Sequence, residues 1–248
     1  MKRRTAVIAL AQIRYFDNSN TNNLEKILKY IRMAKKRKAD IVCFPESCLV
    51  KSSLNLNSKI IKTVKDECKK NSIWCIITDD IEKRKKTYNI SMLIDRKGRI
   101  KGEYKKIHLY GDKTSAGKSP MVFNTDFGKI GIAICWDIAF PDLFEKMKNH
   151  GAEVVFCPAQ WWYDSKAHYE DHKTRELEVL KSLVLARAYE NVFFVALCNP
   201  IMNSKFQISY SAIASPTRIL KEIKSREGLI VHKINFNEIK KIQKIYDA

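Results

Sequence analysis

Three segments of the sequence lead into side chains that can take part in catalysis. Glu46 follows the apolar run ADIVCFP, Lys106 lies in YKKIHLY, and Cys135 follows KIGIAI. Acyl transfer to a cysteine needs these groups, because the thiol requires a base and the developing oxyanion requires a donor. A thiol with an ordinary pKa of about 8.5 is a poor nucleophile at neutral pH until it is deprotonated. Together the three residue types indicate nucleophilic catalysis by a cysteine.

Each residue also has an ordinary structural interpretation. Glu46 follows a proline and is compatible with a turn, and Lys105 and Lys106 are compatible with surface charges. Cys135 is compatible with a core thiol, which is our interpretation of Cys43. No single signal is specific, and the hypothesis depends on the three occurring together.

The elements that position these residues are short apolar runs rich in β-branched side chains, which predict strands. The predicted strands are residues 5–13, 39–46, 73–81, 88–95, 129–137, 152–160, 191–199 and 228–235. Most are apolar throughout, which is typical of strands that are buried on both faces. The pattern predicts a sheet that is covered by helices or packed against a second sheet. Glu46 and Cys135 lie where predicted strands end, as catalytic groups of α/β sheets commonly do.

Two segments have the periodicity of amphipathic helices. Residues 22–38 place Leu24, Ile27, Leu28, Ile31 and Ala34 on one face, and residues 175–190 do the same with Leu177, Leu180, Val184 and Ala188. There is no repeat, no low-complexity segment and no clear linker in the 248 residues. We therefore expect one domain over residues 1–248.

The composition predicts a cytoplasmic protein. The early basic and apolar stretch MKRRTAVIALAQI has no small-residue cleavage site, and no window has the roughly 18 apolar residues of a membrane span. The seven cysteines are an odd number, and most lie in apolar runs, so we expect reduced core thiols. We therefore also expect no membrane partner.

The formal net charge of +19 raises the question of nucleic acid binding. The excess is mostly scattered lysine, without an interleaved aromatic motif, and is typical of a solvated surface. We expect no nucleic acid partner. A metal site is the other alternative, because His168 and His172 are four residues apart in HYEDH. A metalloprotease helix has Glu directly after the first His, whereas Tyr169 is there, so we expect no metal.

Taken in order, the segments FPES, YKKIHLY and GKIGIAICWDIAFPD resemble the three signatures of the nitrilase superfamily of carbon–nitrogen hydrolases. The similarity continues through Tyr88-Asn89, PAQWW at 158–162, ARAYEN at 186–191 and SYSAIASP at 209–216. It extends from about residue 5 to about residue 236. The fold that this resemblance implies is a four-layer α-β-β-α sandwich.

The resemblance also implies roles for individual residues. Cys135 is the expected nucleophile, Glu46 the general base, and Lys106 with the backbone N–H of Trp136 the expected oxyanion donors. The implied activity is that of an amidase that forms a thioester and releases ammonia or an amine, without a cofactor. N-carbamoyl amide hydrolase and nitrilase are alternatives with the same triad, and a non-catalytic or partner-dependent binding protein is an alternative of another class.

The expected partner is a small-molecule amide, carbamoyl compound or nitrile. Gln160 and Trp161 follow the sixth predicted strand, and we expect them to contact substrate together with Trp136; core or interface packing is the alternative for the tryptophans. The excess of lysine is compatible with an acidic substrate such as a dicarboxylic acid monoamide, although a diffuse field does not select one.

One loop departs from the family pattern. Many members carry a second glutamate after the lysine motif, whereas GDKTSAGKSP has none. Asp112 is its only carboxylate and is our candidate for the substrate-binding role; a surface turn at Gly111 and Asp112 is the alternative. Family members commonly form homo-oligomers, so we expect a homodimer or larger assembly. The tail at 237–248 is predicted to be a helix with Ile239, Ile242 and Ile245 in one stripe that packs on its own domain or on a neighbouring subunit.

Overall fold

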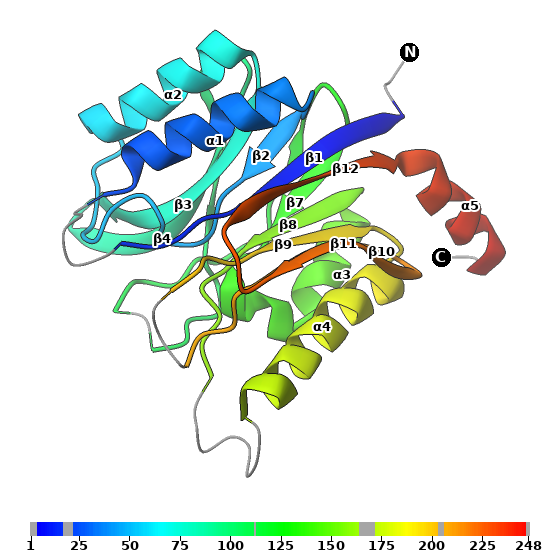
Figure 1. Cartoon of the computed structure of the whole chain (residues 1–248). Helices are drawn as coiled ribbons and strands as arrows, with labels where there is room; N and C mark the ends of the chain where they lie inside the picture. The colour runs from blue at the N-terminus through cyan, green and yellow to red at the C-terminus, as the bar shows by residue number, and fades with distance from the viewer. Residues whose placement is uncertain (1–3, 17–21, 112, 164–171, 203–205, 247–248) are drawn as a thin grey trace.

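The computed structural model describes residues 4–16, 22–111, 113–163, 172–202 and 206–246. Two six-stranded sheets lie face to face, and helices cover both outer faces (Figure 1). One outer layer is α1 (Leu24–Lys36) with α2 (Lys59–Asn71), and the other is α3 (Pro141–Asn149) with α4 (His172–Asn191). This arrangement confirms the predicted four-layer α-β-β-α sandwich.

The first sheet has the strand order β12-β1-β2-β3-β4-β5. Its strands are β12 (Gly228–Asn235), β1 (Thr5–Gln12), β2 (Ile41–Cys43), β3 (Trp74–Lys83), β4 (Lys86–Ile94) and β5 (Ile100–Lys105). Strands β1, β2 and β3 are parallel, and α1 and α2 connect them. Successive side chains of a strand point to opposite faces. In β1, Ile8 and Leu10 therefore face the second sheet, whereas Ala9 and Ala11 face the helices.

The second sheet has the order β11-β10-β9-β8-β7-β6. Its strands are β11 (Arg218–Lys224), β10 (Tyr210–Ser215), β9 (Phe194–Cys198), β8 (Val154–Pro158), β7 (Lys129–Ile132) and β6 (Val122–Asn124). Strands β7, β8 and β9 are parallel and are connected by α3 and α4. The loops that carry Glu46 and Cys135 follow the carboxyl ends of parallel strands, β2 in the first sheet and β7 in the second.

The eight predicted strands all correspond to observed strands, but several predicted ends are wrong. The fifth predicted strand extends through Cys135 to residue 137, whereas β7 ends at Ile132 and Cys135 begins the 3₁₀ turn η1 (Cys135–Ala139). The apolar run continues past the strand because the turn is buried too. The sequence pattern also missed β5, β6, β10, β11, α2 and α3, whose segments are short, polar or only partly apolar.

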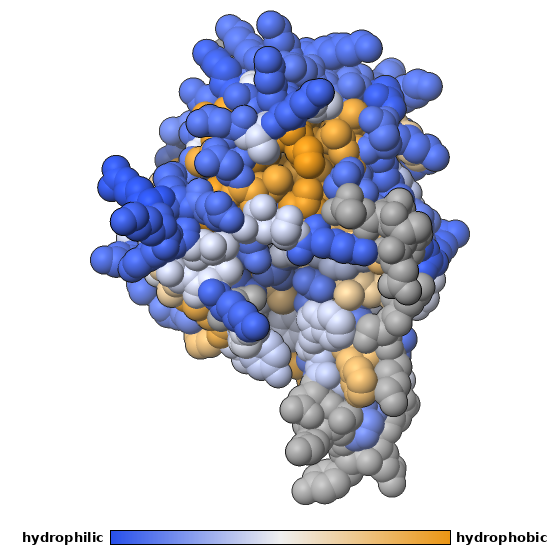
Figure 2. All heavy atoms as spheres, turned by 90° about the vertical axis from the view of Figure 1, so that its left-hand side faces the viewer, coloured by the Kyte–Doolittle hydropathy of each residue, from blue (hydrophilic) through white to orange (hydrophobic). Residues whose placement is uncertain are grey.

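The C-terminal segment forms the predicted helix, α5 (Phe236–Tyr246). Ile239 is buried and Ile242 packs against the core of the same chain, whereas Ile245 is 65% exposed. The first two isoleucines of this stripe, Ile239 and Ile242, therefore pack against the same chain. On the face shown in Figure 2, hydrophilic side chains cover most of the upper surface around an apolar area. Within the described residues, no helix is both long and apolar enough to cross a bilayer.

The two sheets approach closely at the edge formed by β5 and β6, where Gly102 lies against the ring of Phe123. A Cβ atom at Gly102 would overlap this ring. We predict that Gly102→Ala lowers the free energy of unfolding by about 1–3 kcal/mol, as overpacking of a core commonly does. Chemical denaturation measures the change. Lys101→Ala is the matched control, because Lys101 is exposed on the same strand and its loss should change stability by less than about 0.5 kcal/mol. Equal stability of the two variants would contradict this account of the sheet edge.

Candidate active site

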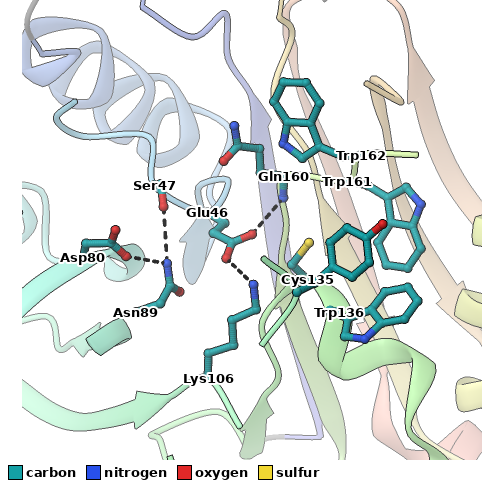
Figure 3. A pocket seen from close by; sticks show the side chains of 11 residues that line it. Glu46, Ser47, Asp80, Asn89, Lys106, Cys135, Trp136, Gln160, Trp161 and Trp162 are labelled. Carbon is teal, nitrogen blue, oxygen red and sulfur yellow. Dashed lines mark hydrogen bonds and ion pairs between the residues drawn. The ribbon is translucent and has the colours of Figure 1, made fainter. Parts of the chain in front are cut away.

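The three residues expected to be catalytic come together from three loops. Glu46 follows β2, Lys106 directly follows β5, and Cys135 follows β7. All three line one cavity of about 300 Å³, where their side chains converge (Figure 3). The remaining residues of the described lining are Ser47, Asp80, Asn89, Tyr110, Trp136, Gln160, Trp161 and Trp162.

Glu46 and Lys106 form a buried ion pair. The Lys106 Nζ lies 2.9 Å from Oε1 of Glu46, and the backbone N–H of Gln160 donates to Oε2 at 3.1 Å. The residues are only 4% and 2% exposed. The Glu46 N–H also donates to the carbonyl oxygen of Ala159 at 3.3 Å. Buried charges are tolerated when they are paired and hydrogen-bonded, and here the partners come from both sheets.

The two neighbouring lysines have different environments. Two backbone hydrogen bonds hold Lys106 in place. The Lys106 N–H donates to the carbonyl oxygen of Asn89 at 2.9 Å, and the Gly117 N–H donates to the carbonyl oxygen of Lys106 at 2.7 Å. Its side chain points into the cavity (Figure 3). The Lys105 ammonium lies 4.0 Å from the ring centroid of Tyr88, outside this lining. This geometry distinguishes Lys106 from Lys105 as the lysine that lies in the cavity beside Glu46.

Cys135 is 8% exposed and has a φ of 47°, in the left-handed region that a non-glycine residue seldom adopts. Figure 3 shows its sulfur in the cavity, on the same side as the Glu46 carboxylate. Burial raises the pKa of the Cys135 thiol well above its usual value, and the negative charge of Glu46 raises it further. Lys106 and the Gln160 N–H oppose this effect on the pKa without reversing it. Cys135 therefore rests as a thiol at neutral pH and needs a base.

Asp137 connects the cysteine turn to the lysine loop. Its Oδ2 accepts the Tyr104 hydroxyl at 2.6 Å and the Ile134 N–H at 2.9 Å. Its Oδ1 lies 2.9 Å from the backbone nitrogen and 2.9 Å from Nδ1 of His108. Asp137 is completely buried. One carboxylate thus fixes the turn that carries Cys135 relative to the segment 104–108.

Aromatic side chains line the opposite side of the cavity from Asp80 and Asn89 (Figure 3). The Trp136 ring lies 4.9 Å from the Tyr110 ring and 5.6 Å from the Trp161 ring, centroid to centroid. Trp161 is only 2% exposed and its Nε1 donates to Glu176 at 2.7 Å, so most of this side chain is core. Trp162 is 39% exposed, so it offers more free surface at this wall.

The outcome differs among the residues that we expected to bind substrate. Trp136, Gln160 and Trp161 line the cavity. Gln160 is held by its backbone bond to Glu46 and by a 3.3 Å contact between its Nε2 and the sulfur of Met202. Asp112 lies outside the described residues.

Sequence reasoning missed the polar wall of the cavity. Asn89 Nδ2 donates to Asp80 Oδ1 at 2.9 Å and to Ser47 Oγ at 3.3 Å. The signal was an adjacent pair of carboxylates, Asp79 and Asp80, inside the otherwise apolar strand β3. Strand alternation separates them, so that Asp80 lines the cavity while Asp79 accepts the Leu49 N–H at 2.9 Å. Burial raises the pKa of Asp79 to about 8.

The metal alternative has no support in the part of the chain that the structure describes. Its residues contain no group of three or more His, Cys, Asp or Glu side chains that could hold a metal ion. His172 begins α4, whereas His168 lies outside the described residues. The seven cysteines are all buried and free, so they form no disulfide framework.

Solved structures share this fold. Nit3 of Saccharomyces cerevisiae, a member of branch 10 of the nitrilase superfamily, has a TM-score of 0.82 at 22% identity, over 98% of this chain and 94% of that chain. A carbon–nitrogen hydrolase from Helicobacter pylori G27 has a TM-score of 0.87 at 16% identity, with the same coverage of 98% and 94%. At these identities the similarity establishes the fold alone.

Relatives are also found by sequence. The 2-oxoglutaramate amidase of Bacillus subtilis is 33% identical over 166 residues, which are 64% of this chain and 60% of that protein. A deaminated glutathione amidase of Dictyostelium discoideum is 28% identical over 220 residues, 76% of this chain and 72% of that protein. The chain thus matches less than two thirds of the length of the first of these relatives.

The match to a family model is more extensive. The model of the carbon–nitrogen hydrolases aligns with residues 7–244 of the 248-residue chain. The aligned range includes the loops that carry Glu46, Lys106 and Cys135, and strands of both sheets of the sandwich. The chain belongs to the carbon–nitrogen hydrolase family.

Proposed function

We propose that this protein is an amidase that hydrolyses a non-peptide amide bond of a small molecule through a thioester on Cys135. The observation that carries the proposal is the convergence of Glu46, Lys106 and Cys135 in one cavity of about 300 Å³. Two sequence relatives are named as amidases. A structure with the same fold, a mutant of the amidase from Nesterenkonia sp. AN1, has the acetamide moiety of fluoroacetamide added covalently at its active-site cysteine.

Acylation begins when the Cys135 sulfur attacks the amide carbonyl carbon. Glu46 takes the thiol proton, which is necessary because the raised pKa keeps this thiol protonated at rest. The Lys106 ammonium and the N–H of Trp136 stabilise the oxyanion of the tetrahedral intermediate. The intermediate collapses by cleaving the C–N bond, and Glu46 gives its proton to the departing ammonia or amine. The product of this half-reaction is a thioester on Cys135.

Deacylation repeats the sequence with water as the nucleophile. Glu46 takes a proton from water as the water attacks the thioester carbonyl. The second tetrahedral intermediate uses the same oxyanion donors and collapses by cleaving the C–S bond. The Cys135 sulfur leaves and takes the proton from Glu46, which restores both groups and releases the carboxylic acid. No step requires a cofactor.

We also propose one domain over residues 1–248, a cytoplasmic location and a homo-oligomeric state. The buried, free cysteines are typical of proteins from a reducing compartment. Exposed Val179 and Tyr189 on α4, with Ile245 and Tyr246 on α5, supply apolar surface for contact between subunits.

Removal of the nucleophile is the first test of the amidase proposal. We predict that Cys135→Ala lowers ammonia release by at least about a thousandfold, since no other group can form the acyl-enzyme. The assay uses a panel of monoamides, N-carbamoyl amino acids, simple carboxamides and nitriles. Cys157→Ala is the matched control, because this core thiol should affect stability rather than chemistry. Equal ammonia release by wild type and Cys135→Ala would refute the nucleophile assignment.

The lysine pair offers a second test. We predict that Lys106→Ala lowers kcat by about a hundred- to a thousandfold, as loss of one oxyanion donor does in other acyl-transfer enzymes. Lys105→Ala should lose only the contact with Tyr88 and keep kcat within about threefold. Circular dichroism of both variants checks that they are folded, since Lys106→Ala leaves Glu46 buried without its ion-pair partner. Equal or reversed effects on kcat would show that Lys106 has been assigned wrongly.

Glu46→Gln separates the charge of Glu46 from its role as a base. The Glu46 charge raises the pKa of Cys135, so its removal should lower that pKa and move Cys135 alkylation by iodoacetamide to lower pH. Amide turnover should nevertheless fall by at least about a hundredfold, because proton transfer to and from Cys135 is lost. Mass spectrometry follows alkylation at Cys135 across a pH series. A higher alkylation pH or preserved turnover in this variant would contradict the proposed role.

A further inference from the structure

We infer that Asn89 is a positioning residue, which fixes the loop that carries Glu46 relative to Lys106. The inference rests on the proposed amidase function and adds a residue to its mechanism. Asn89 lies in β4 and is hydrogen-bonded to both segments, through its backbone on the lysine side and through its side chain on the glutamate side (Figure 3). It acts through Glu46 and Lys106 rather than on the substrate itself.

The backbone of Asn89 holds the lysine side. Its carbonyl oxygen accepts the N–H of Lys106 at 2.9 Å. This bond continues the pairing of β4 with β5, in which Ile90 lies opposite Lys105. A hydrogen bond that extends a strand pair leaves the bonded backbone little freedom, so Asn89 is a fixed reference for the position of Lys106.

The side chain of Asn89 holds the glutamate side. Its Nδ2 donates at 3.3 Å to the Oγ of Ser47, the residue after Glu46, and at 2.9 Å to Oδ1 of Asp80. Asp80 lies opposite Asn89 in the pairing of β3 with β4, and its carboxylate orients the amino group of the amide. Ser47 has a φ of 48°, a left-handed conformation that a non-glycine residue keeps only when its surroundings hold it. The bond from Asn89 is part of what holds the chain next to Glu46.

The amide oxygen of Asn89 indicates a role beyond strand pairing. Asn89 is 2% exposed, and its Oδ1 has no hydrogen-bond partner among the described residues. An unpaired buried oxygen costs free energy, so an apolar side chain would suit a purely structural position in β4 better. The neighbouring pair on the same two strands, Thr78 and Ser91, avoids this cost, because the two hydroxyls bond each other at 2.6 Å. The benefit of an asparagine here lies in its Nδ2 group, which bonds the residue after Glu46.

Two alanine variants test the inference. Asn89→Ala removes the bond to Ser47 and keeps the backbone bond to Lys106, so it loosens the Glu46 loop alone. We expect kcat to fall by about tenfold or more while KM changes by less than about threefold, because a misplaced catalytic group slows the chemical step. Ser91→Ala is the matched control. It removes a buried bond between the same two strands outside the cavity lining, and kcat should stay within about threefold of the wild type.

Chemical denaturation checks that both variants are folded under the conditions of the assay. Equal kcat values for Asn89→Ala and Ser91→Ala would overturn the inference, because loss of a buried bond between β3 and β4 would then be the whole effect. A loss in Asn89→Ala that is confined to KM would also overturn it, because Asn89 would then bind substrate rather than position Glu46.

A third substitution, Ser47→Ala, tests the contact through which Asn89 acts. The double variant Ser47→Ala/Asn89→Ala should have a kcat within about threefold of Asn89→Ala alone, because both substitutions remove the same hydrogen bond. Losses in kcat that multiply would show that Asn89 acts through a different neighbour, such as Asp80, and would contradict the inference.

A measurement without turnover separates this inference from the amidase proposal. Burial and the Glu46 charge both raise the pKa of the Cys135 thiol, whereas Lys106 lowers it and keeps its backbone bond in Asn89→Ala. A looser Glu46 loop weakens both effects that raise this pKa, so Asn89→Ala should be alkylated by iodoacetamide at lower pH than the wild type, and Ser91→Ala should not. An unchanged alkylation pH in Asn89→Ala would overturn the inference. Failure of the wild type to hydrolyse any amide would count against the amidase proposal alone, and alkylation would still decide whether Asn89 positions Glu46.

Discussion

The buried ion pair between Glu46 and Lys106 is the interaction on which the site depends. Its two charges are almost fully removed from water, and burial of either one alone would be strongly unfavourable. The pair is tolerated because Lys106 and the Gln160 N–H each bond one carboxylate oxygen of Glu46. Lys106 follows a strand of the same sheet as Glu46, whereas Gln160 follows a strand of the other sheet, so both carboxylate oxygens are bonded only when the sandwich has assembled. The same requirement gives the site its fixed geometry, since Glu46 has little freedom to turn away from Cys135.

Asp137 supplies the second constraint, because it holds the turn that begins at Cys135 against the loop that follows Lys106. Its hydrogen bonds reach Tyr104, His108 and Ile134, which belong to segments far apart in the sequence. The left-handed φ of Cys135 persists in this setting because the surrounding bonds determine the turn. Cys135, Glu46 and Lys106, to which we assign catalytic roles in the proposed mechanism, are thus held by buried polar groups. Such preorganisation is what transition-state stabilisation requires.

Much of this arrangement can be predicted from the sequence, for identifiable reasons. Buried parallel strands are continuous apolar runs, so the central strands of both sheets and the residues after them are evident. Short or polar edge strands such as β5, β6 and β11 lack this pattern. Their stability comes from hydrogen bonding to the neighbouring strand and from close contact between the sheets, as between Gly102 and Phe123. The ion pair was not predictable, since no local pattern reveals which charges will be buried together. Asp80 was missed for the same reason, although two carboxylates inside an apolar strand are a usable signal of a polar cavity.

The central claim is that the Cys135 sulfur carries the acyl group during amide hydrolysis. The most direct measurement is an acid quench of turnover, followed by proteolysis and mass spectrometry of the peptides. The account predicts a mass increase equal to the acyl group minus one hydrogen on the peptide that contains Cys135, seen only in the presence of substrate. An acyl group found on a different side chain during turnover would contradict it.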